Sequence, residues 1–192
     1  MIKSLLLFTT TFFLAAVTVG LSIDTEASQV TWKGYKVTGS HEGTIDVQEG
    51  NLDFTDGVLT GGSFTIDMTS IKDTDASRGM AAKLEGHLKS ADFFGVEDHP
   101  TATFVITKVV SRGMVGDYRI TGDITIKEHT ESIRFNAKVT EADGVYTATA
   151  DLKLDRTDFD VRYGSGSFID NLGDKTIYDE FDMGITLVTT AK

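Results

Sequence analysis

The chain has 192 residues, a formal net charge of −11 at pH 7 and no cysteine. The lack of cysteine excludes a disulfide framework and a lipid-modified cysteine, so a folded domain must draw its stability from its sheet and core. The acidic composition argues against a nucleic-acid partner, because a negative surface repels phosphate backbones.

The first segment, residues 1–22, is typical of a secretory signal peptide. Lys3 provides a positive start, an apolar run follows, and the small residues Gly20 and Ser22 suit a cleavage site. The apolar run is shorter than the ~20 residues that span a bilayer. We therefore expect cleavage after Ser22, a periplasmic or secreted location, no stable membrane insertion afterwards, and a single domain over residues 23–192. An uncleaved membrane anchor is the alternative.

The rest of the chain predicts an all-β domain, because apolar residues recur at every second position over long stretches. The alternation is clearest in residues 118–126 and 146–154. Glycine is abundant and proline nearly absent, as expected where many hairpins turn without interrupting a sheet. In chain order we expect strands at residues 29–37, 43–48 with 52–54, 62–71, 101–110, 115–127, 131–141, 145–155 and 178–189, with a helix over residues 77–89.

The length of the expected strands favours a closed barrel. Residues 115–127 would make a strand far longer than the usual ~5–6 residues. Eight such strands, each with one apolar face, must form a sandwich or close on themselves, and closure removes the edges that invite aggregation. We therefore predict an eight-stranded antiparallel β-barrel. Its tall, narrow, apolar interior would suit a long linear hydrocarbon.

One short α-helix is inserted between the strands. Met80, Leu84 and Leu88 recur at every fourth position and give it an apolar stripe, with His87 beside the stripe. We expect the helix to lie across one end of the barrel as a lid or plug. The alternative is a helix that covers the core without gating anything.

Several short segments resemble those of a known family: VTWKGYKV (30–37), GSHEG (39–43), GHLKSADFF (86–94), HPTATF (99–104) and DRTDF (155–159). Together they resemble the YceI-like family of exported polyisoprenoid-binding proteins. The resemblance implies an extended lipocalin-like barrel that holds an isoprenoid lipid, such as a quinone tail, in its interior. Glu128 departs from the pattern, since a glycine is expected in the turn before Thr130.

The candidate ligand-binding residues are the side chains expected to face the interior and those at the end of the helix. On the strands they are Trp32, Phe64, Ile66, Met68, Phe104, Ile106, Ile120, Ile124, Phe135 and Met183. At the helix and the segment after it they are Leu84, His87, Leu88 and Phe93.

Arg156 completes the set, because a guanidinium suits the phosphate or carbonyl oxygens of a lipid head group.

Each of these residues also has an ordinary structural interpretation. The apolar side chains could be plain core, and Trp32 could plug the barrel floor. Arg156 could pair with neighbouring aspartates. Gly122, which is in phase with the apolar face of its strand, could mark a bend or a close approach of a ligand.

No catalytic or metal-binding motif stands out. The four histidines, at positions 41, 87, 99 and 129, show no ligand spacing. Asp73-x-Asp75 and Asp158-x-Asp160 resemble fragments of calcium loops without the remaining ligands. The sequence therefore predicts no metal site, no catalytic residue and no cofactor other than a bound isoprenoid lipid or quinone.

The leading interpretation is a non-enzymatic periplasmic carrier for a long isoprenoid lipid, of the polyisoprenoid or isoprenoid-quinone type. The alternative is a lipocalin-like isomerase or hydrolase that uses His87 or His41 as base beside Asp92. An outer-membrane barrel would need apolar residues on its outer face, where Arg119 and Lys138 are expected. The sequence does not decide the oligomeric state, and a homodimer is compatible with it.

Overall fold

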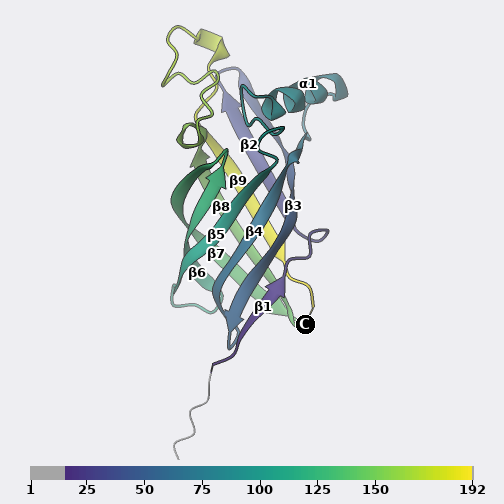
Figure 1. The fold of residues 1–192 in the computed structure, drawn as a ribbon, viewed down its shortest axis with the longest axis vertical. Coiled ribbons are helices and arrows are strands. Elements are labelled where there is room, and N and C mark those ends of the chain that lie inside the picture. The colour runs from purple at the N-terminus through teal and green to yellow at the C-terminus, as the bar shows by residue number, and fades with distance from the viewer. Residues whose placement is uncertain (1–15, 192) are drawn as a thin grey trace, which may run out of the picture.

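The computed structural model describes residues 16–191, which form a closed antiparallel barrel (Figure 1). Its elements are β1 (Thr18–Ser22), β2 (Gln29–Lys36), β3 (Gly39–Thr55), β4 (Val58–Asp73), α1 (Arg78–Lys89), β5 (Thr101–Ser111), β6 (Asp117–Ile126), β7 (His129–Ala142), β8 (Val145–Asp155), the 3₁₀ turns η1 (Arg156–Phe159) and η2 (Gly173–Lys175), and β9 (Glu180–Val188).

Strands β2 to β9 make the predicted eight-stranded barrel. The sheet order is β1-β3-β2-β9-β8-β7-β6-β5-β4, and an additional β3–β4 pairing closes the ring. The pairings between these strands are antiparallel, and short connections join β2 to β3, β3 to β4 and each consecutive pair from β5 to β8. The all-β class and the single inserted α-helix were both predicted, and both are confirmed among residues 16–191.

The short strand β1 was not predicted, because its residues were assigned to the signal peptide. It pairs with the end of β3, where Ser22 is opposite Asn51, and Leu21 is buried in the core. β2 pairs with the beginning of β3 on the same edge. β1 and β2 therefore lie end to end beside β3. Most of the predicted signal segment, residues 1–15, lies outside the described residues. Cleavage after Ser22 would remove the whole of β1.

Several strands differ in length from the prediction, and β4 runs from Val58 to Asp73 where residues 62–71 were expected. β6 has 10 residues and is shorter than expected, whereas β3 has 17 and runs through the break expected near residue 50. Register shifts next to Asp46, Glu49 and Phe54 mark bulges that let β3 bend without ending. Gly50 belongs to this bend, because a Cβ there would lie 2.6 Å from the Cβ of Phe64 on β4.

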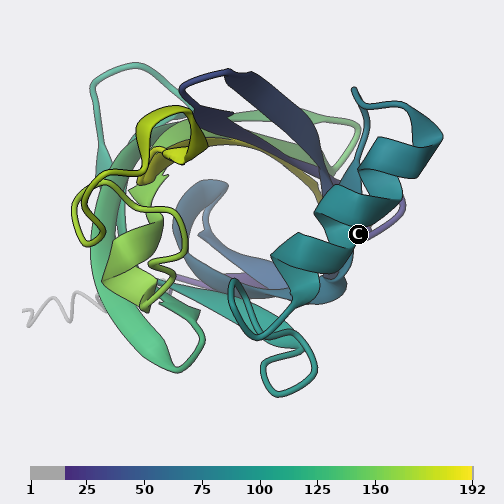
Figure 2. The ribbon, with the colours of Figure 1, turned by 90° about the horizontal axis from the view of Figure 1, so that it is seen from above.

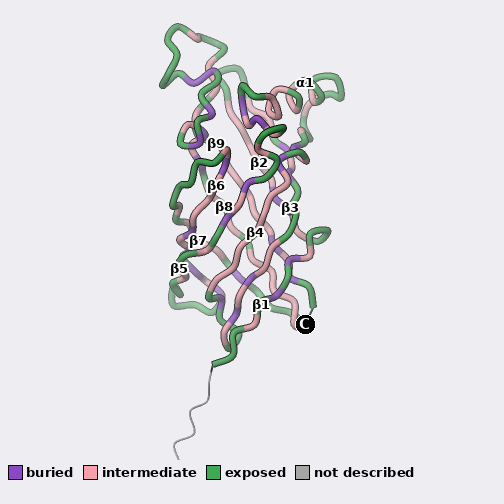
Figure 3. The backbone as a smooth tube through the Cα atoms, in the orientation of Figure 1, coloured by how far each residue is buried: buried purple, intermediate pink, exposed green. Residues whose placement is uncertain are grey.

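Side chains alternate between the interior and the outer surface along the strands. On β6, Tyr118 and Ile120 are buried and Arg119 between them is exposed, and on β7 Lys138 is also exposed. Buried and half-buried residues alternate with exposed ones along the strands, and the connections at the two ends are largely exposed (Figure 3). This arrangement encloses one apolar core along the barrel.

Gly122 is explained by its neighbouring strand. A Cβ at Gly122 would lie 2.3 Å from Cζ of Phe104 and 2.7 Å from the carbonyl oxygen of Val105, both on β5. The ring of Phe104 therefore occupies the space that a side chain at position 122 would need. Close approach within the sheet requires this glycine.

The two ends of the barrel are built differently. α1 and the long β8–β9 connection lie at one end, and β1 and the C-terminus lie at the other (Figure 1). Seen from above, α1 lies along the rim, and the β8–β9 connection lies on the opposite side of the ring (Figure 2). Met80, the first residue of the predicted apolar stripe, is 60% exposed, so the stripe covers only the second half of the helix. Among residues 16–191, no helix is both long and apolar enough to cross a membrane.

The β6–β7 turn contains the residue that departs from the family pattern. Lys127 has φ 50° and Glu128 has φ 67°, and the pair joins strands in which Ile126 is opposite His129. A turn with two left-handed residues strongly favours glycine, because a side chain makes this conformation costly. We expect Glu128→Gly to raise the free energy of unfolding by about 1 kcal/mol, measured by urea denaturation.

The matched control for this prediction is the equivalent turn between β7 and β8. Gly144 has φ 81°, and a Cβ there would meet nothing within 4 Å, so Gly144→Glu would test conformational strain without a clash. It should lower the free energy of unfolding by a similar amount. An unchanged or lower stability of Glu128→Gly would contradict the assignment of strain to this turn.

Candidate functional site

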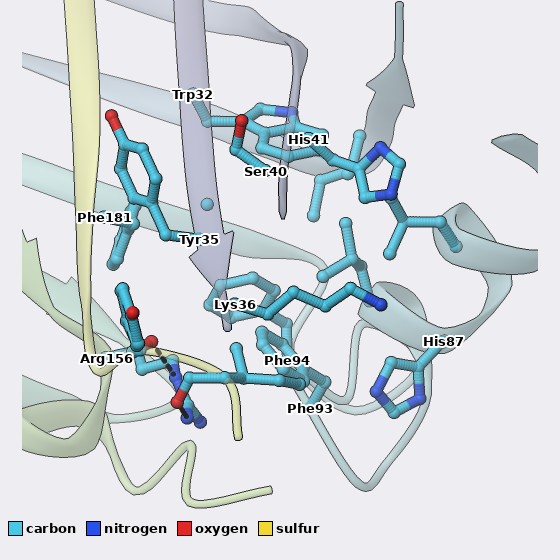
Figure 4. Close-up of a pocket in the computed structure, with 16 residues that line it drawn as sticks. Trp32, Tyr35, Lys36, Ser40, His41, His87, Phe93, Phe94, Arg156 and Phe181 are labelled. Atoms are coloured by element: carbon cyan, nitrogen blue, oxygen red, sulfur yellow. Dashed lines mark hydrogen bonds between the residues drawn. The ribbon is translucent and has the colours of Figure 1, made fainter. Parts of the chain in front are cut away.

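An apolar cavity lies at the end of the barrel that carries α1. Its volume is about 140 Å³. We refer to it as the upper cavity. Its wall is formed by β2, β3, β4 and β9, by the helix, and by the segments around residues 93 and 177. The side chains that surround it in Figure 4 include Trp32, Lys36, His41, His87, Phe93, Phe94, Arg156 and Phe181.

α1 closes one side of the upper cavity with its second half. Leu84 and Leu88, one turn apart, both line the cavity. The second half of the helix is tied to the last residue of β4, where the backbone N–H of Asp73 donates to Oε1 of Glu85 at 3.0 Å. It is held at its end, where the backbone N–H and the hydroxyl of Ser90 both donate to the carbonyl oxygen of His87. The bond to Asp73 fixes the helix to β4 at the rim, with Leu84 and Leu88 in the cavity wall.

Aromatic rings continue the wall beyond the helix. Phe93 is buried, and its ring meets those of Phe94 and His87 edge-on, with centroids 5.1 and 5.4 Å away. The ring of Tyr163, from the β8–β9 connection, lies 4.5 Å from that of His87. His87 therefore joins the helix to the opposite side of the mouth through ring contacts.

Trp32 enters the wall from β2 and lies beside a glycine. Gly43 is its cross-strand partner on β3, and a Cβ there would lie 2.7 Å from the indole ring and 1.8 Å from the carbonyl oxygen of Lys72. The indole N–H donates to the carbonyl oxygen of Thr44 at 3.3 Å. Trp32 thus lines the upper cavity, at the helix end of the barrel, with its polar atom satisfied by the sheet.

Arg156 is buried beneath the mouth and holds the backbone of the β8–β9 connection. Its guanidinium donates to the carbonyl oxygens of Val161, Ile177 and Tyr178 at 2.6, 3.1 and 3.1 Å, and to Oδ1 of Asp179 at 3.1 Å. Figure 4 shows the group at the edge of the cavity.

Burial lowers the pKa of Arg156, and the carboxylates of Asp179 and Asp155 oppose that shift. Four of the five N–H groups of this arginine are engaged with protein, so its main role is structural.

A second, smaller cavity of about 40 Å³ lies deeper in the barrel. We refer to it as the lower cavity. Its wall includes Phe64, Phe104, Ile106, Ile120, Phe135 and Ile185. None of the residues from 16 to 191 lines both cavities. On β9, Phe181 lines the upper cavity and Ile185 the lower one, so Met183 lies between them on the same face of the strand.

The candidate residues predicted from the sequence fall into three groups. Six line the upper cavity: Trp32, Leu84, His87, Leu88, Phe93 and Arg156. Five line the lower cavity: Phe64, Phe104, Ile106, Ile120 and Phe135. Four belong to the apolar core without lining either cavity: Ile66, Met68, Ile124 and Met183.

Several residues of the upper cavity were not predicted. Gly34 has no side chain to reveal it, and Ile177 lies in an irregular connection where no period applies. Phe181 could have been found, because it begins the alternation that continues through Met183 and Ile185.

The hydroxyl of Tyr35 donates to Oδ2 of Asp182 at 2.5 Å and links β2 to β9 at the mouth. This bond is the main cause that lowers the pKa of Asp182; burial opposes it and Lys153 reinforces it. The same bond raises the pKa of Tyr35. Because the folded-state pKa of Asp182 is the lower one, the carboxylate contributes stability above its ordinary pKa, and this is lost as the pH falls through the folded-state value.

We expect Tyr35→Phe to raise the pKa of Asp182 toward its ordinary value. The loss of stability on acidification would then begin at a higher pH than in the wild type. Carbon-detected NMR titration of the Asp182 carboxyl group measures the pKa directly. An unchanged pKa would contradict the role given to Tyr35.

The histidines at the mouth do not contact the aspartate proposed for the enzyme alternative. Asp92 is exposed, and among residues 16–191 it forms no ion pair with His41 or His87. Nδ1 of His41 lies instead 3.0 Å from Oδ1 of Asp75. This hydrogen bond is the main cause that lowers the pKa of Asp75, and burial opposes the shift.

Comparisons with known proteins agree on the fold. The solved structure of BcnA from Burkholderia cenocepacia superposes with a TM-score of 0.70 and 24% identity, over 88% of this chain and 99% of that one. A polyisoprenoid binding domain from Saccharophagus degradans superposes with a TM-score of 0.67 and 16% identity, over 89% of this chain and 98% of that one. At these identities the likeness concerns the fold.

Sequence comparison identifies relatives as well. A UPF0312 protein of Pectobacterium atrosepticum and protein YceI of Escherichia coli are each 37% identical over 75 residues, which is 39% of this chain and 35% of each relative. The chain thus spans about a third of the length of these curated relatives. The YceI-like domain family matches residues 21–189, which is nearly all of the described barrel. The chain belongs to the YceI-like family.

Proposed function

We propose that this protein binds a long isoprenoid lipid, of the polyisoprenoid or quinone type, in the barrel interior and carries it without chemical change. The observation that carries the proposal is the upper cavity, an apolar chamber at the barrel mouth that adjoins an apolar core. Moving a prenyl chain from water into such surroundings is favourable by about 25 cal/mol per Å².

The volume of the upper cavity limits how much of such a lipid fits without rearrangement of side chains. An engineered cavity of about 150 Å³ in another protein holds one benzene molecule, so the 140 Å³ of the upper cavity suits about one isoprene unit. A longer chain requires the upper and lower cavities to join. Met183 lies between them, and its unbranched side chain can change rotamer at low cost.

The mouth offers a place for a polar head group. Lys36, Ser40 and His41 line the same cavity as the apolar side chains, and Lys36 is exposed at the edge of β2. A few polar groups around an apolar chamber set the orientation of a ligand. The polyisoprenoid binding domain from Saccharophagus degradans shares the fold and supports the choice of lipid class.

The periplasmic or secreted location belongs to the same proposal. Its support is the signal-like segment that precedes β1. Because Leu21 is buried and β1 pairs with β3, cleavage before Thr18 would leave the barrel whole. N-terminal sequencing of the exported protein tests this. A mature chain that begins at Ile23 would support cleavage after Ser22 instead.

The direct experiment is mass spectrometry of organic extracts from protein purified, without detergent, from a host that makes isoprenoid lipids. We expect one class of prenyl lipid to co-purify in a constant ratio. Incubation of the purified protein with a defined polyprenol or quinone should return that lipid unchanged.

Two results would oppose the proposal. If no lipid co-purified and no added prenyl lipid bound, the carrier function would be wrong. If the lipid bound and was converted, and His87→Ala or His41→Ala abolished the conversion, the enzyme alternative would replace it.

A further inference from the structure

We propose that His41, Asp73 and Asp75 form a binding site for a divalent transition-metal ion such as zinc. His41 is on β3, Asp73 is the last residue of β4, and Asp75 is in the connection to α1. One ligand atom from each of the three side chains lies within 4.8 Å of the others. The inference does not rest on the lipid proposal, although His41 also lines the upper cavity.

The strongest observation is a carboxylate oxygen without a partner. The side chain of Asp73 has an exposed fraction of 0%. Its Oδ1 accepts a hydrogen bond from the backbone N–H of Ala76 at 2.7 Å, but within residues 16–191 no donor reaches Oδ2. A buried acceptor left unpaired costs about 1–3 kcal/mol, and more when it is charged.

His41 alone does not relieve this oxygen. Nδ1 of His41 lies 3.0 Å from Oδ1 of Asp75 and 3.5 Å from Oδ2 of Asp73. A ring nitrogen carries a single hydrogen, and the shorter distance directs it to Asp75. A cation placed between the three groups would contact both carboxylates and the nitrogen at once.

The distances suit a small transition metal. Ligand atoms about 2.1 Å from a zinc ion at tetrahedral angles lie roughly 3.4 Å apart, and the two measured separations from Nδ1 are 3.0 and 3.5 Å. One imidazole and two carboxylates favour zinc, iron or manganese over calcium, which prefers six or more oxygen atoms. His41 and Asp75 are 30% and 37% exposed, so an ion can enter from solvent.

The surrounding backbone is already ordered for this role. The N–H and hydroxyl of Thr74 both donate to the carbonyl oxygen of Glu42, next to His41, at 2.9 and 3.2 Å. The N–H of Asp73 donates to Glu85 on α1. The Glu42 carboxylate is paired with Lys33 at 2.8 Å, so we do not count it among the metal ligands. Outer contacts of this kind orient metal ligands.

Sequence spacing could not reveal this group. Asp73 and Asp75 are two residues apart in the chain, but His41 is brought to them only by the pairing of β3 with β4, in which Gly43 is opposite Asp73. The expectation of no metal site rested on local spacing alone.

The test is isothermal titration calorimetry of the purified, chelator-treated protein with zinc chloride and, separately, manganese chloride. We expect saturable binding of one equivalent of at least one metal, with a higher melting temperature of the loaded protein. His41→Gln and Asp73→Asn should each weaken binding by about tenfold or more.

The matched controls are His129→Gln and Asp158→Asn, which change the same residue types at exposed positions outside the site. They should bind as the wild type does. Circular dichroism checks that each variant keeps its barrel, and if Asp73→Asn did not fold, His41→Gln and Asp75→Asn would decide.

Two outcomes would overturn the metal site: no saturable binding of either ion, or equal binding by wild type and the site variants.

Discussion

Gly34→Phe is expected to weaken binding of a prenyl chain by somewhat more than a hundredfold, about 3 kcal/mol. Gly34 is on β2 in the wall of the upper cavity. A Cβ at this position would meet no atom within 4 Å, so a side chain can project into open space without straining the sheet. A phenylalanine side chain would fill the volume that one isoprene unit needs. Titration of a fluorescently labelled polyprenol measures the change.

Gly86→Phe is the matched control for Gly34→Phe. Gly86 is exposed on α1, a Cβ there also meets nothing within 4 Å, and it does not line the cavity. The control should bind the polyprenol with the wild-type affinity. A folded Gly34→Phe variant that bound equally well would show that the ligand does not occupy the upper cavity, and the carrier proposal in this form would be lost.

Arg156→Met should lower the free energy of unfolding by about 3–5 kcal/mol. Methionine keeps an apolar stem of similar length, but it removes the Arg156 donor from three carbonyl oxygens and from Oδ1 of Asp179. Because the β8–β9 connection has little regular structure beyond η1 and η2, this guanidinium is a main determinant of its position. Urea denaturation followed by circular dichroism measures the loss.

Arg162→Met separates this effect from the general loss of an arginine. Arg162 is 55% exposed, and its Nε lies 3.2 Å from Asp160. An exposed ion pair contributes at most about 1 kcal/mol, so this variant should be nearly as stable as the wild type. Equal losses in the two variants would contradict the role assigned to Arg156.

Residues 101–111 and 145–155 show how far local pattern alone leads. Their strands were expected within one residue of the observed bounds, because the period of two that defines a half-buried strand is a property of adjacent residues. The same period identified Phe104, Ile106 and Ile120, which line the lower cavity. Sequence pattern was therefore sufficient for the barrel class and for the inward face of most strands.

β1 and β3 show where local pattern fails. Residues 18–22 read as the end of a signal segment and became a strand only through their pairing with residues 51–55. The break expected in β3 near Gly50 disappeared because bulges and a close approach to Phe64 continue the strand. Both outcomes depend on partners far along the chain, which no short window contains.

The sequence by itself determined that this chain forms a barrel with an apolar interior, because the alternation of apolar and polar residues along a strand involves only neighbouring positions. Only the tertiary structure decided that the apolar interior holds two separately lined cavities, that Arg156 donates to backbone carbonyls, and that His41 lies beside Asp73. The physical reason is that cavities and side-chain clusters arise from strand register and from how completely distant side chains fill the enclosed space.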